Sequence, residues 1–196
     1  MHLTEKRLSR IEEVVSKRQK GLTVVIENVH DPHNVSAIFR TAEAVGIDRI
    51  YLIYNTNKFP KIGRISSASA NKWIDRSHFN NVQDCYNELR KKEFRIYSTF
   101  MDDRESNLSL FDLDFTVNSA IVVGNEHEGL SEEASKYADC NFLIPQYGMV
   151  QSLNVSVAAA VCLYEALRQR RIAGKYSEPQ YSSEELQEKI KSYLAK

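Results

Sequence analysis

The segment LTVVIENVHDPHNVSAIFRTAEAVGIDRIYLI, residues 22–53, contains a complete strand–helix–strand unit. Residues 22–26 are a short apolar run before a polar turn, which predicts a buried strand. The pattern then predicts a helix over residues 34–45 that ends at Gly46, since glycine readily takes the left-handed conformation that closes helices. The apolar residues 50–53 supply the second strand. A strand, a helix and a strand in this order are typical of a parallel sheet.

The same alternation continues toward the C-terminus. Further strands are predicted at residues 73–79, 94–98, 119–123 and 141–144. Further helices are predicted at 82–92, in a short segment capped by Ser131, and from Asn154 to about Arg170. Strands that alternate with helices indicate an α/β fold in which helices flank a mainly parallel sheet.

Both ends of the chain are predicted to carry helices outside this alternation. Apolar residues at helical spacing, with a largely basic polar face, predict an N-terminal basic helix within residues 1–20, which we expect to be an extension that binds a polyanion. The alternating region, residues 21–174, is expected to be the main domain. A linker then leads to Ser182 and Glu185, which resemble a capping box and open a C-terminal helix within residues 175–196.

Composition places the chain among ordinary globular proteins. It has 196 residues, 42% of them hydrophobic and 27% charged, which suits one domain with a sizeable core. No apolar run approaches the roughly 20 residues of a membrane span, and the N-terminus lacks a signal-peptide pattern, so we expect a cytoplasmic protein. Cys85, Cys140 and Cys162 are far apart in the chain, which predicts reduced thiols and neither a disulfide framework nor a zinc site.

Charge is distributed unevenly although the formal net charge is zero. Residues 1–80 carry +5, residues 81–143 carry −7 and residues 144–196 carry +2. A polyanion is therefore expected to meet a surface built from the first and last parts of the chain. Its candidate cations are Lys6, Arg7, Arg10, Lys17, Arg18, Lys20, Lys58, Lys61, Arg64, Arg168, Arg170 and Arg171. For any one of these residues, a solvated helix face is the simpler interpretation.

The turn before the last long helix has the features of a binding segment. Pro145 and Gly148 favour a bend in which backbone N–H and C=O groups stay free for a ligand. Gln151, Ser152 and Asn154 add compact side-chain donors and acceptors beside it. A ligand site is therefore expected where this turn meets the helix.

Three segments together, residues 27–46, 121–131 and 144–160, closely resemble the signature motifs of the SpoU/TrmH family, in the family's order. Members of that family are S-adenosylmethionine-dependent RNA ribose 2'-O-methyltransferases. The resemblance implies an α/β-knot (SPOUT) fold, with a trefoil knot in the C-terminal part of the parallel-sheet domain. It also implies a homodimer with its sites near the subunit interface.

The resemblance further implies a set of catalytic residues, namely Arg40, Asn34, Glu126, Ser152 and Asn154. In the family the motif 1 arginine activates the 2'-hydroxyl. Since a guanidinium stays protonated in proteins, binding a phosphate and the nascent alkoxide is physically easier than accepting a proton. The alternative for Arg40 is a surface arginine paired with Glu43, and the alternative for Glu126 is an exposed loop carboxylate.

The cofactor implied by the resemblance is S-adenosyl-L-methionine, and no metal is implied. Residues that match the family's cofactor-binding positions are Thr99, Gly124, Ile144, Gly148 and Leu153. Gly124 and Gly129 match neither a dinucleotide fingerprint nor a Walker loop, which argues against a dinucleotide or ATP site.

The substrate implied by the resemblance is tRNA. A short basic N-terminal helix directly before motif 1 is similar to the branch of the family that methylates guanosine 18 in the D-loop. Methylation of ribosomal RNA or of another tRNA position is the alternative within the family. A knotted RNA-binding protein without catalytic activity is the alternative from another class.

Three other interpretations concern single residues. A serine hydrolase built on Ser152 would need His30 or His127 as its base, and no nucleophile-elbow motif is present. His30 and His33 are close enough in sequence to suggest a metal site, but a polar loop is the preferred interpretation. Trp73 either stacks an RNA base or belongs to a core or an interface.

Overall fold

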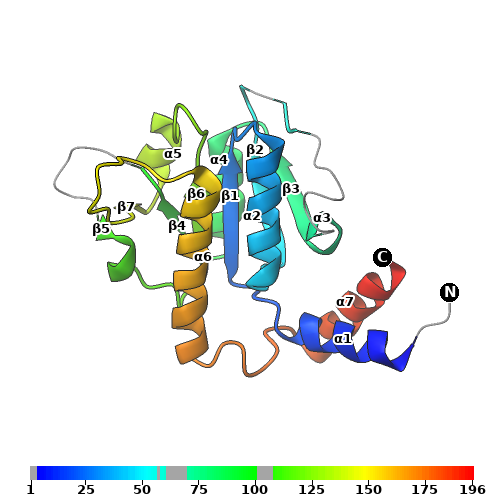
Figure 1. The fold of residues 1–196 in the computed structure, drawn as a ribbon. Coiled ribbons are helices and arrows are strands. Elements are labelled where there is room, and N and C mark those ends of the chain that lie inside the picture. The colour runs from blue at the N-terminus through cyan, green and yellow to red at the C-terminus, as the bar shows by residue number, and fades with distance from the viewer. Residues whose placement is uncertain (1–3, 57, 61–69, 101–107) are drawn as a thin grey trace.

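The computed structural model describes residues 4–56, 58–60, 70–100 and 108–196, and within them one seven-stranded sheet in the order β3-β2-β1-β6-β4-β7-β5 (Figure 1). Its strands are β1 (Leu22–Glu27), β2 (Arg49–Ile53), β3 (Asp75–Phe79), β4 (Arg95–Ser98), β5 (Leu108–Ser109), β6 (Ser119–Val123) and β7 (Cys140–Leu143). All neighbouring strands pair in parallel. The predicted α/β class with a parallel sheet is confirmed, and the trefoil knot stays a prediction.

Helices cover both faces of this sheet. Helices α2 (Pro32–Ala44) and α6 (Val155–Ile172) lie side by side on one face, and α4 (Val82–Lys91) and α5 (Glu132–Tyr137) cover the other (Figure 1). Two short helices, α3 (Ala70–Trp73) and the 3-10 helix η1 (Leu110–Asp112), complete the connections. Strand β5 and η1 were not predicted from the sequence.

The core is divided in two by the central strands. Val24 faces the α2 and α6 side, where it joins a cluster that includes Ile38 and Leu163. Val25, the next residue, joins the cluster that includes Leu89 on the opposite face. Successive side chains point to opposite faces of a strand, so a strand buried on both faces must be apolar throughout. The uninterrupted apolar runs in the sequence have this origin.

Local signals at the helix ends are also observed. Asp31 caps α2 by accepting a hydrogen bond from the backbone N–H of His33 at 2.8 Å, so the helix starts at Pro32, two residues earlier than predicted. Proline is well suited to this first position because the N–H it lacks would have no helical partner. Gly46 has φ of +84° just past the helix, and Ser131 caps α5, both as predicted.

The strand predicted at residues 73–79 is present, with a start two residues later than predicted. Residues 73–79 were expected to form one strand, but Trp73 ends helix α3 and the strand begins at Asp75. The Trp73 ring packs against the ring of Tyr193, with centroids 5.2 Å apart, and the Tyr193 hydroxyl donates to the Trp73 carbonyl at 2.7 Å. This contact with the far end of the chain takes Trp73 out of the sheet.

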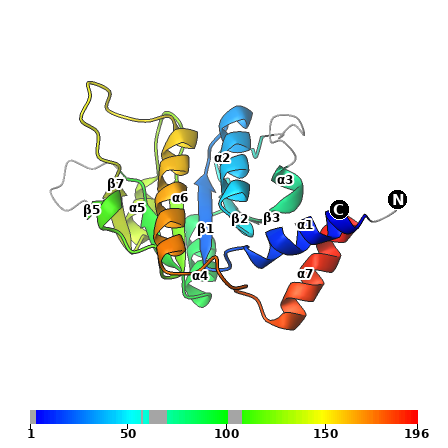
Figure 2. The same ribbon diagram turned by 60° about the horizontal axis from the view of Figure 1, so that its bottom comes forward.

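The two chain ends pack on each other beside the amino ends of the strands. Helix α1 (Glu5–Ser16) lies against α7 (Ser183–Ala195), and Ile11, Val15 and Tyr193 form a small core between them (Figure 2). The predicted capping box of Ser182 and Glu185 is present. Helix α1 stops four residues before residue 20, because the backbone N–H of Gln19 instead donates to the carbonyl of Gly46 at 2.8 Å.

Two arginines assigned to the polyanion-binding surface are buried, which corrects that prediction. Arg18 is fully buried, pairs with the Glu43 carboxylate at 2.9 Å and donates to the Ile47 carbonyl at 2.9 Å. It joins the end of α1 to the end of α2. The same ion pair shows that Glu43 is engaged by Arg18 and not by Arg40, the partner that the alternative interpretation required.

Arg170, near the end of α6, is 1% exposed and has no carboxylate partner among the described residues. Its guanidinium donates to the carbonyls of Phe115, Val117 and Gly21 and to the Gln19 side chain. Burial lowers the pKa of Arg170 to about 10, which still leaves it protonated at neutral pH. Arg170 therefore ties α6 to the two segments that lead into β1 and β6.

Other sequence expectations have simpler outcomes. Cys85 and Cys162 are buried and free, and burial raises the pKa of each thiol to about 12, whereas Cys140 is only half-buried. Lys61 and Arg64 lie outside the described residues. No helix in the described part of the chain combines the length and the apolar character needed to cross a membrane.

We expect Arg170→Ala to lower the free energy of unfolding by about 3 kcal/mol, since it leaves several buried carbonyl groups without a donor. Urea unfolding followed by circular dichroism measures the change. The matched control is Arg171→Ala, one residue further along α6 and exposed, which should change stability by less than about 0.5 kcal/mol. Equal effects of the two substitutions would contradict the assignment of Arg170 as a buried tie.

Candidate functional site

A cavity of about 860 Å³ lies at the carboxyl ends of β4, β6 and β7. Ligands in open parallel sheets bind at this end of the strands, because the loops that follow the strands gather there. Four of the five predicted cofactor-binding residues line the cavity, namely Thr99, Gly124, Ile144 and Leu153. Gly148 is exposed and does not border it.

Gly124 shows how closely the backbone segments approach each other here. A Cβ atom built on Gly124 would lie 2.3 Å from the carbonyl of Gly129, a separation that real side chains do not reach. The loop between the two glycines is closed by Asn125, whose backbone N–H donates to the Gly129 carbonyl at 2.8 Å. A residue larger than glycine at position 124 would displace this loop and the cavity wall that it forms.

The predicted catalytic residues divide into three groups. Glu126, Ser152 and Asn154 line the cavity directly. Asn34 does not border it but is hydrogen-bonded to two residues that do. Arg40 is exposed on α2 and does not border the cavity either.

The side chain of Asn34 connects the three motif segments. Its amide nitrogen donates to Glu126 Oε1 at 3.0 Å, and its amide oxygen accepts from Asn154 Nδ2 at 3.0 Å. The Asn154 oxygen faces its own helix, where it accepts from the backbone N–H of Ser156 at 2.9 Å and caps α6. Three residues far apart in sequence thus form one chain, Glu126–Asn34–Asn154, in which Asn34 and Asn154 each use both polar atoms of the amide.

Glu126 is held at the start of α2 by further donors. It accepts from the backbone N–H of Asp31 at 3.2 Å and of His30 at 3.4 Å, and the His30 ring lies 3.2 Å from it. Partial burial on its own raises the pKa of Glu126, but hydrogen bonds from Asn34 and from backbone N–H groups outweigh burial and lower the pKa below its ordinary value. Glu126 is therefore an ionised acceptor at neutral pH.

Arg40 presents a free cation near this network. It lies six residues after Asn34, about 9 Å along the helix axis, on the exposed side of α2. Within the described ranges no hydrogen bond or ion pair engages its guanidinium. An unpaired guanidinium can bind an anion through two parallel hydrogen bonds, in a bidentate manner, without first breaking another contact.

Two alternatives from the sequence find no support in the geometry. In the described part of the chain, Ser152 has neither His30 nor His127 as a hydrogen-bond partner, so a serine–histidine pair is not formed. His30 instead contacts Glu126 and Asn125. The same residues contain no group of three or more side chains arranged to hold a metal ion.

Sequence reasoning missed two residues that hold the cavity loops. Glu27, 1% exposed at the end of β1, accepts from the backbone N–H of Ser131 at 2.9 Å and from its hydroxyl at 2.6 Å. Asn125 donates from its side chain to the carbonyl of Asn28 at 2.9 Å. A carboxylate that ends an otherwise apolar strand was the available signal for Glu27, because such a residue needs a buried partner.

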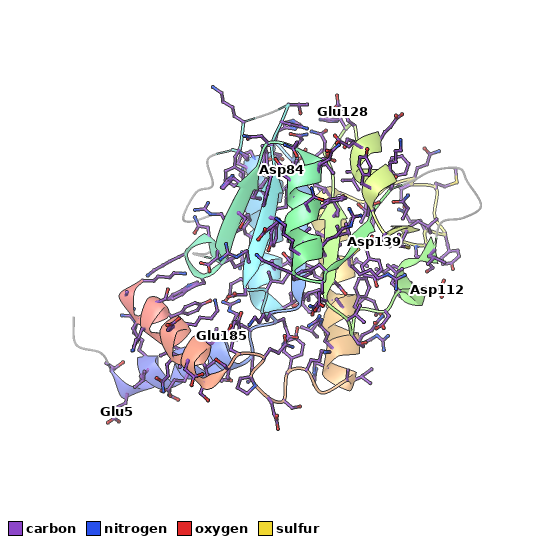
Figure 3. All side chains as sticks on the ribbon, turned by 180° about the vertical axis from the view of Figure 1, so that it is seen from behind. Glu5, Asp84, Asp112, Glu128, Asp139 and Glu185 are labelled. Carbon is purple, nitrogen blue, oxygen red and sulfur yellow. The ribbon has the colours of Figure 1, made fainter. Side chains whose placement is uncertain are left out.

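Acidic side chains also occur on the elements that cover the face of the sheet opposite α2. Asp84 on α4, Asp139 before β7 and Glu128 after β6 are labelled in Figure 3, which views the molecule from the side of α4 and α5. Helix α2, which carries Arg40, covers the opposite face of the sheet. Helices α4 and α5 carry acidic and basic residues in near balance, so this face offers a polyanion no excess of cations. The residues are Asp84, Glu88, Glu132 and Glu133 against Arg90, Lys91 and Lys136.

Known proteins resemble this chain over most of its length. Residues 21–164 match the model of the SpoU rRNA Methylase family. The chain is 42% identical over 193 residues to a tRNA (guanosine(18)-2'-O)-methyltransferase of Thermus thermophilus, which covers 98% of both proteins. The crystal structure of the Aquifex aeolicus TrmH/SpoU tRNA modifying enzyme is similar with a TM-score of 0.89 and 40% identity, over 97% of both chains.

A more distant structure includes a cofactor. The SpoU methyltransferase AviRb of Streptomyces viridochromogenes, solved in complex with AdoMet, is similar with a TM-score of 0.69 and 25% identity. The match covers 81% of this chain and 62% of that one.

We expect Glu126→Gln to destabilise the protein by about 1 kcal/mol at neutral pH, since a neutral amide accepts hydrogen bonds more weakly than a carboxylate. The folded-state pKa of Glu126 is lowered, so its contribution is complete above the ordinary value of about 4.3 and is lost as the pH falls through the lowered pKa. The difference in unfolding free energy between wild type and variant should therefore shrink in acid, as urea unfolding at a series of pH values would measure.

The control for this series is Glu128→Gln, an exposed carboxylate on the same loop. Its difference from wild type should stay near zero at every pH. If the Glu126→Gln difference stayed constant down to about pH 3, the ionised carboxylate would not be what stabilises the site.

Proposed function

Since the chain belongs to the SpoU rRNA methylase family, we propose that it transfers a methyl group from S-adenosylmethionine to the ribose 2'-oxygen of guanosine 18 in tRNA. The observation that carries the substrate assignment is the 42% identity to a tRNA (guanosine(18)-2'-O)-methyltransferase over 98% of both proteins. A match that runs from end to end includes α1 and α7 as well as the cavity. The Glu126–Asn34–Asn154 chain supports the catalytic assignment.

The cavity fits the proposed cofactor. Its volume of about 860 Å³ is within the usual range for small-molecule sites, which is roughly 300–1,000 Å³. Gln146 in its wall has a buried amide oxygen without a hydrogen-bond partner among the described residues, and a cofactor amino group would satisfy it. We assign the binding of the cofactor to the cavity residues Thr99, Gly124, Ile144 and Leu153, together with Gly148 on the adjoining loop.

S-adenosylmethionine, when bound, supplies an electrophilic methyl group attached to a sulfonium sulfur. The protein must then place the 2'-oxygen in line with it and stabilise the charge that develops as the hydroxyl loses its proton. We assign that stabilisation to Arg40, whose permanently charged guanidinium suits an alkoxide or an adjacent phosphate better than it suits proton removal. Asn34, Glu126 and Asn154 fix the start of α2, and Ser152 faces the cavity as a substrate donor or acceptor.

We propose that the active form is a homodimer that packs through α6. Val157 and Tyr164, about two turns apart, are 47% and 53% exposed on this helix, and Tyr147 and Met149 on the preceding loop are almost fully exposed. Apolar residues gathered in this way typically mark an interface. Arg40 does not border the cavity of its own chain, and α2 lies beside α6, so a second copy on this face would bring Arg40 toward a neighbouring cavity.

For the chemistry, we expect unmodified tRNA transcripts to acquire one 2'-O-methyl group, at guanosine 18, when incubated with the protein and methyl-labelled S-adenosylmethionine. Mass spectrometry of nuclease fragments maps the label. Arg40→Ala should reduce the rate at least about 100-fold, as removal of one transition-state donor typically does, while cofactor affinity stays unchanged. Arg40→Lys should be little more active than Arg40→Ala, because a lysine ammonium cannot bind an anion in the bidentate geometry of a guanidinium.

The control for charge is Arg76→Ala, an exposed arginine at the far edge strand, which should behave as wild type. If the label were found only in ribosomal RNA, the proposed methyl transfer would stand and the assignment of tRNA as the substrate would be wrong. If wild type bound the cofactor but labelled neither RNA, the non-catalytic alternative would replace the proposal. Loss of cofactor affinity in Arg40→Ala would overturn the assignment of Arg40.

For the assembly, we expect wild type to sediment as a dimer and Tyr164→Glu as a monomer, because a buried, unpaired carboxylate opposes association. Analytical ultracentrifugation makes the measurement. Tyr137→Glu on α5, at the opposite face of the sheet, is the matched control and should remain dimeric. A monomeric wild type, or a dimer that Tyr164→Glu leaves intact, would contradict an interface on α6.

A further inference from the structure

A second concave site lies between α1 and α3, away from the cofactor cavity. This groove has a volume of about 390 Å³ and is lined by Thr4, Lys6, Arg7, Arg10, Ile11 and Trp73. Three of its six residues are cations from the first two turns of α1, and one is aromatic. The combination of positive charge with an aromatic ring is typical of sites for unpaired nucleotides.

Trp73 is held in a fixed position within the groove. Its ring packs against Tyr193 at 5.2 Å between centroids, and its backbone carbonyl accepts the Tyr193 hydroxyl at 2.7 Å. Lys72 places its ammonium 4.9 Å from the centre of the same ring. Trp73 is half-buried, so part of the ring remains accessible. A fixed and partly accessible indole loses little conformational entropy when a base stacks on it.

The ion pair that Arg10 forms with Glu13 is exposed to solvent and therefore weak. Arg10 contacts Glu13 at 2.8 Å, but the two side chains are 71% and 49% exposed, and Glu13 is shared with Lys17. Exposed pairs of this kind contribute little and can exchange with a phosphate. Lys6 lies one turn before Arg10 on the same side of α1, so both cations can face one phosphate group.

The groove and the cofactor cavity lie at opposite ends of the sheet. Trp73 lies two residues before the start of β3, whereas the cavity is lined by residues that follow β4, β6 and β7, and all strands run in parallel. Six-residue strand β1 spans about 20 Å between these ends. One RNA that contacts both sites on a protomer must therefore be much larger than a nucleotide, as a folded tRNA is.

We infer that the groove between α1 and α3 binds one unpaired nucleotide of the substrate RNA, with its base stacked on Trp73 and its phosphate bound by Lys6 and Arg10. The inference rests on the proposed function, since it concerns the same RNA. It assigns an RNA nucleotide as the ligand of the basic N-terminal helix. It also assigns Trp73 a role in stacking a base, in addition to its packing against Tyr193. It also separates recognition of the folded RNA from the chemistry at the other end of the sheet.

Trp73 is the only tryptophan in the chain, so its fluorescence reports on this groove directly. We expect unmodified tRNA transcript to quench Trp73 emission in a saturable way, while S-adenosylmethionine alone leaves it unchanged. The double variant Lys6→Gln/Arg10→Gln should bind tRNA about tenfold more weakly. Its plot of log affinity against log salt should be shallower by roughly one to two units, since up to two phosphate contacts are lost.

The control with the same loss of charge is Lys91→Gln/Lys136→Gln, on the α4 and α5 face, which should bind as wild type does. At saturating tRNA both double variants should methylate at the wild-type rate, because neither touches the cavity, and only Lys6→Gln/Arg10→Gln should show a raised KM. Trp73→Phe keeps an aromatic ring on which a base can stack, so this variant should retain most of the affinity for tRNA. It serves as the conservative variant that leaves the packing against Tyr193 largely intact.

Three results would overturn the inference. The first is that tRNA binds without changing Trp73 emission, and the second is that tRNA quenches the Lys6→Gln/Arg10→Gln variant as strongly as wild type. The third is that polyglutamate quenches Trp73 emission as strongly as tRNA does. The last would identify an acidic protein as the occupant. Failure of the proposed function looks different, because the wild type would then transfer no methyl group. Quenching by tRNA and its loss in the double variant would still report on the groove.

Discussion

The arrangement of the site depends on the side-chain amide of Asn34. An amide offers one donor nitrogen and one acceptor oxygen at its two ends, and here the nitrogen meets Glu126 while the oxygen meets Asn154. An aspartate would set a second carboxylate against Glu126, and a leucine would remove both hydrogen bonds and leave the partly buried Glu126 with its backbone donors alone. Because Glu126 also accepts from the backbone at the start of α2, this one amide links the first turn of the helix that carries Arg40 to the loops after β6 and before α6.

The buried arginines show that the net charge of a chain does not describe the charge on its surface. Arg18 and Arg170 bring the ends of α1, α2 and α6 together through carbonyl groups and one carboxylate, so their charge is used inside the molecule. Lys6, Arg10 and Arg40 are among the cations left at the surface, and others, such as Arg76 and Lys91, lie on other elements. Net charge therefore says less about a polyanion partner than the face on which each charge lies.

Much of the fold could be predicted because its signals are local. The apolar runs, the glycine after α2 and the capping serines each act within a few residues, and the strands and helices they predicted are present. Trp73 was misplaced because its environment is supplied by Tyr193, 120 residues away. Arg18 and Arg170 were misassigned for a similar reason, since an arginine looks the same in sequence whether its partners are water or distant carbonyls. The family motifs identified Asn34, Glu126 and Asn154, but the hydrogen bonds that join them, across 92 and 120 residues, needed the structure.

The geometry also limits how a ribose hydroxyl can be activated at this site. Glu126 is the carboxylate of the Glu126–Asn34–Asn154 chain, yet its oxygens already accept from Asn34, Asp31 and His30, and these bonds lower its pKa. A carboxylate with a lowered pKa and several donors is a weak base. Arg40 cannot accept a proton at all under ordinary conditions. With neither group suited to removing the proton, the proposed reaction would depend on positioning the 2'-oxygen and stabilising its developing charge, and solvent or a phosphate of the substrate would accept the proton.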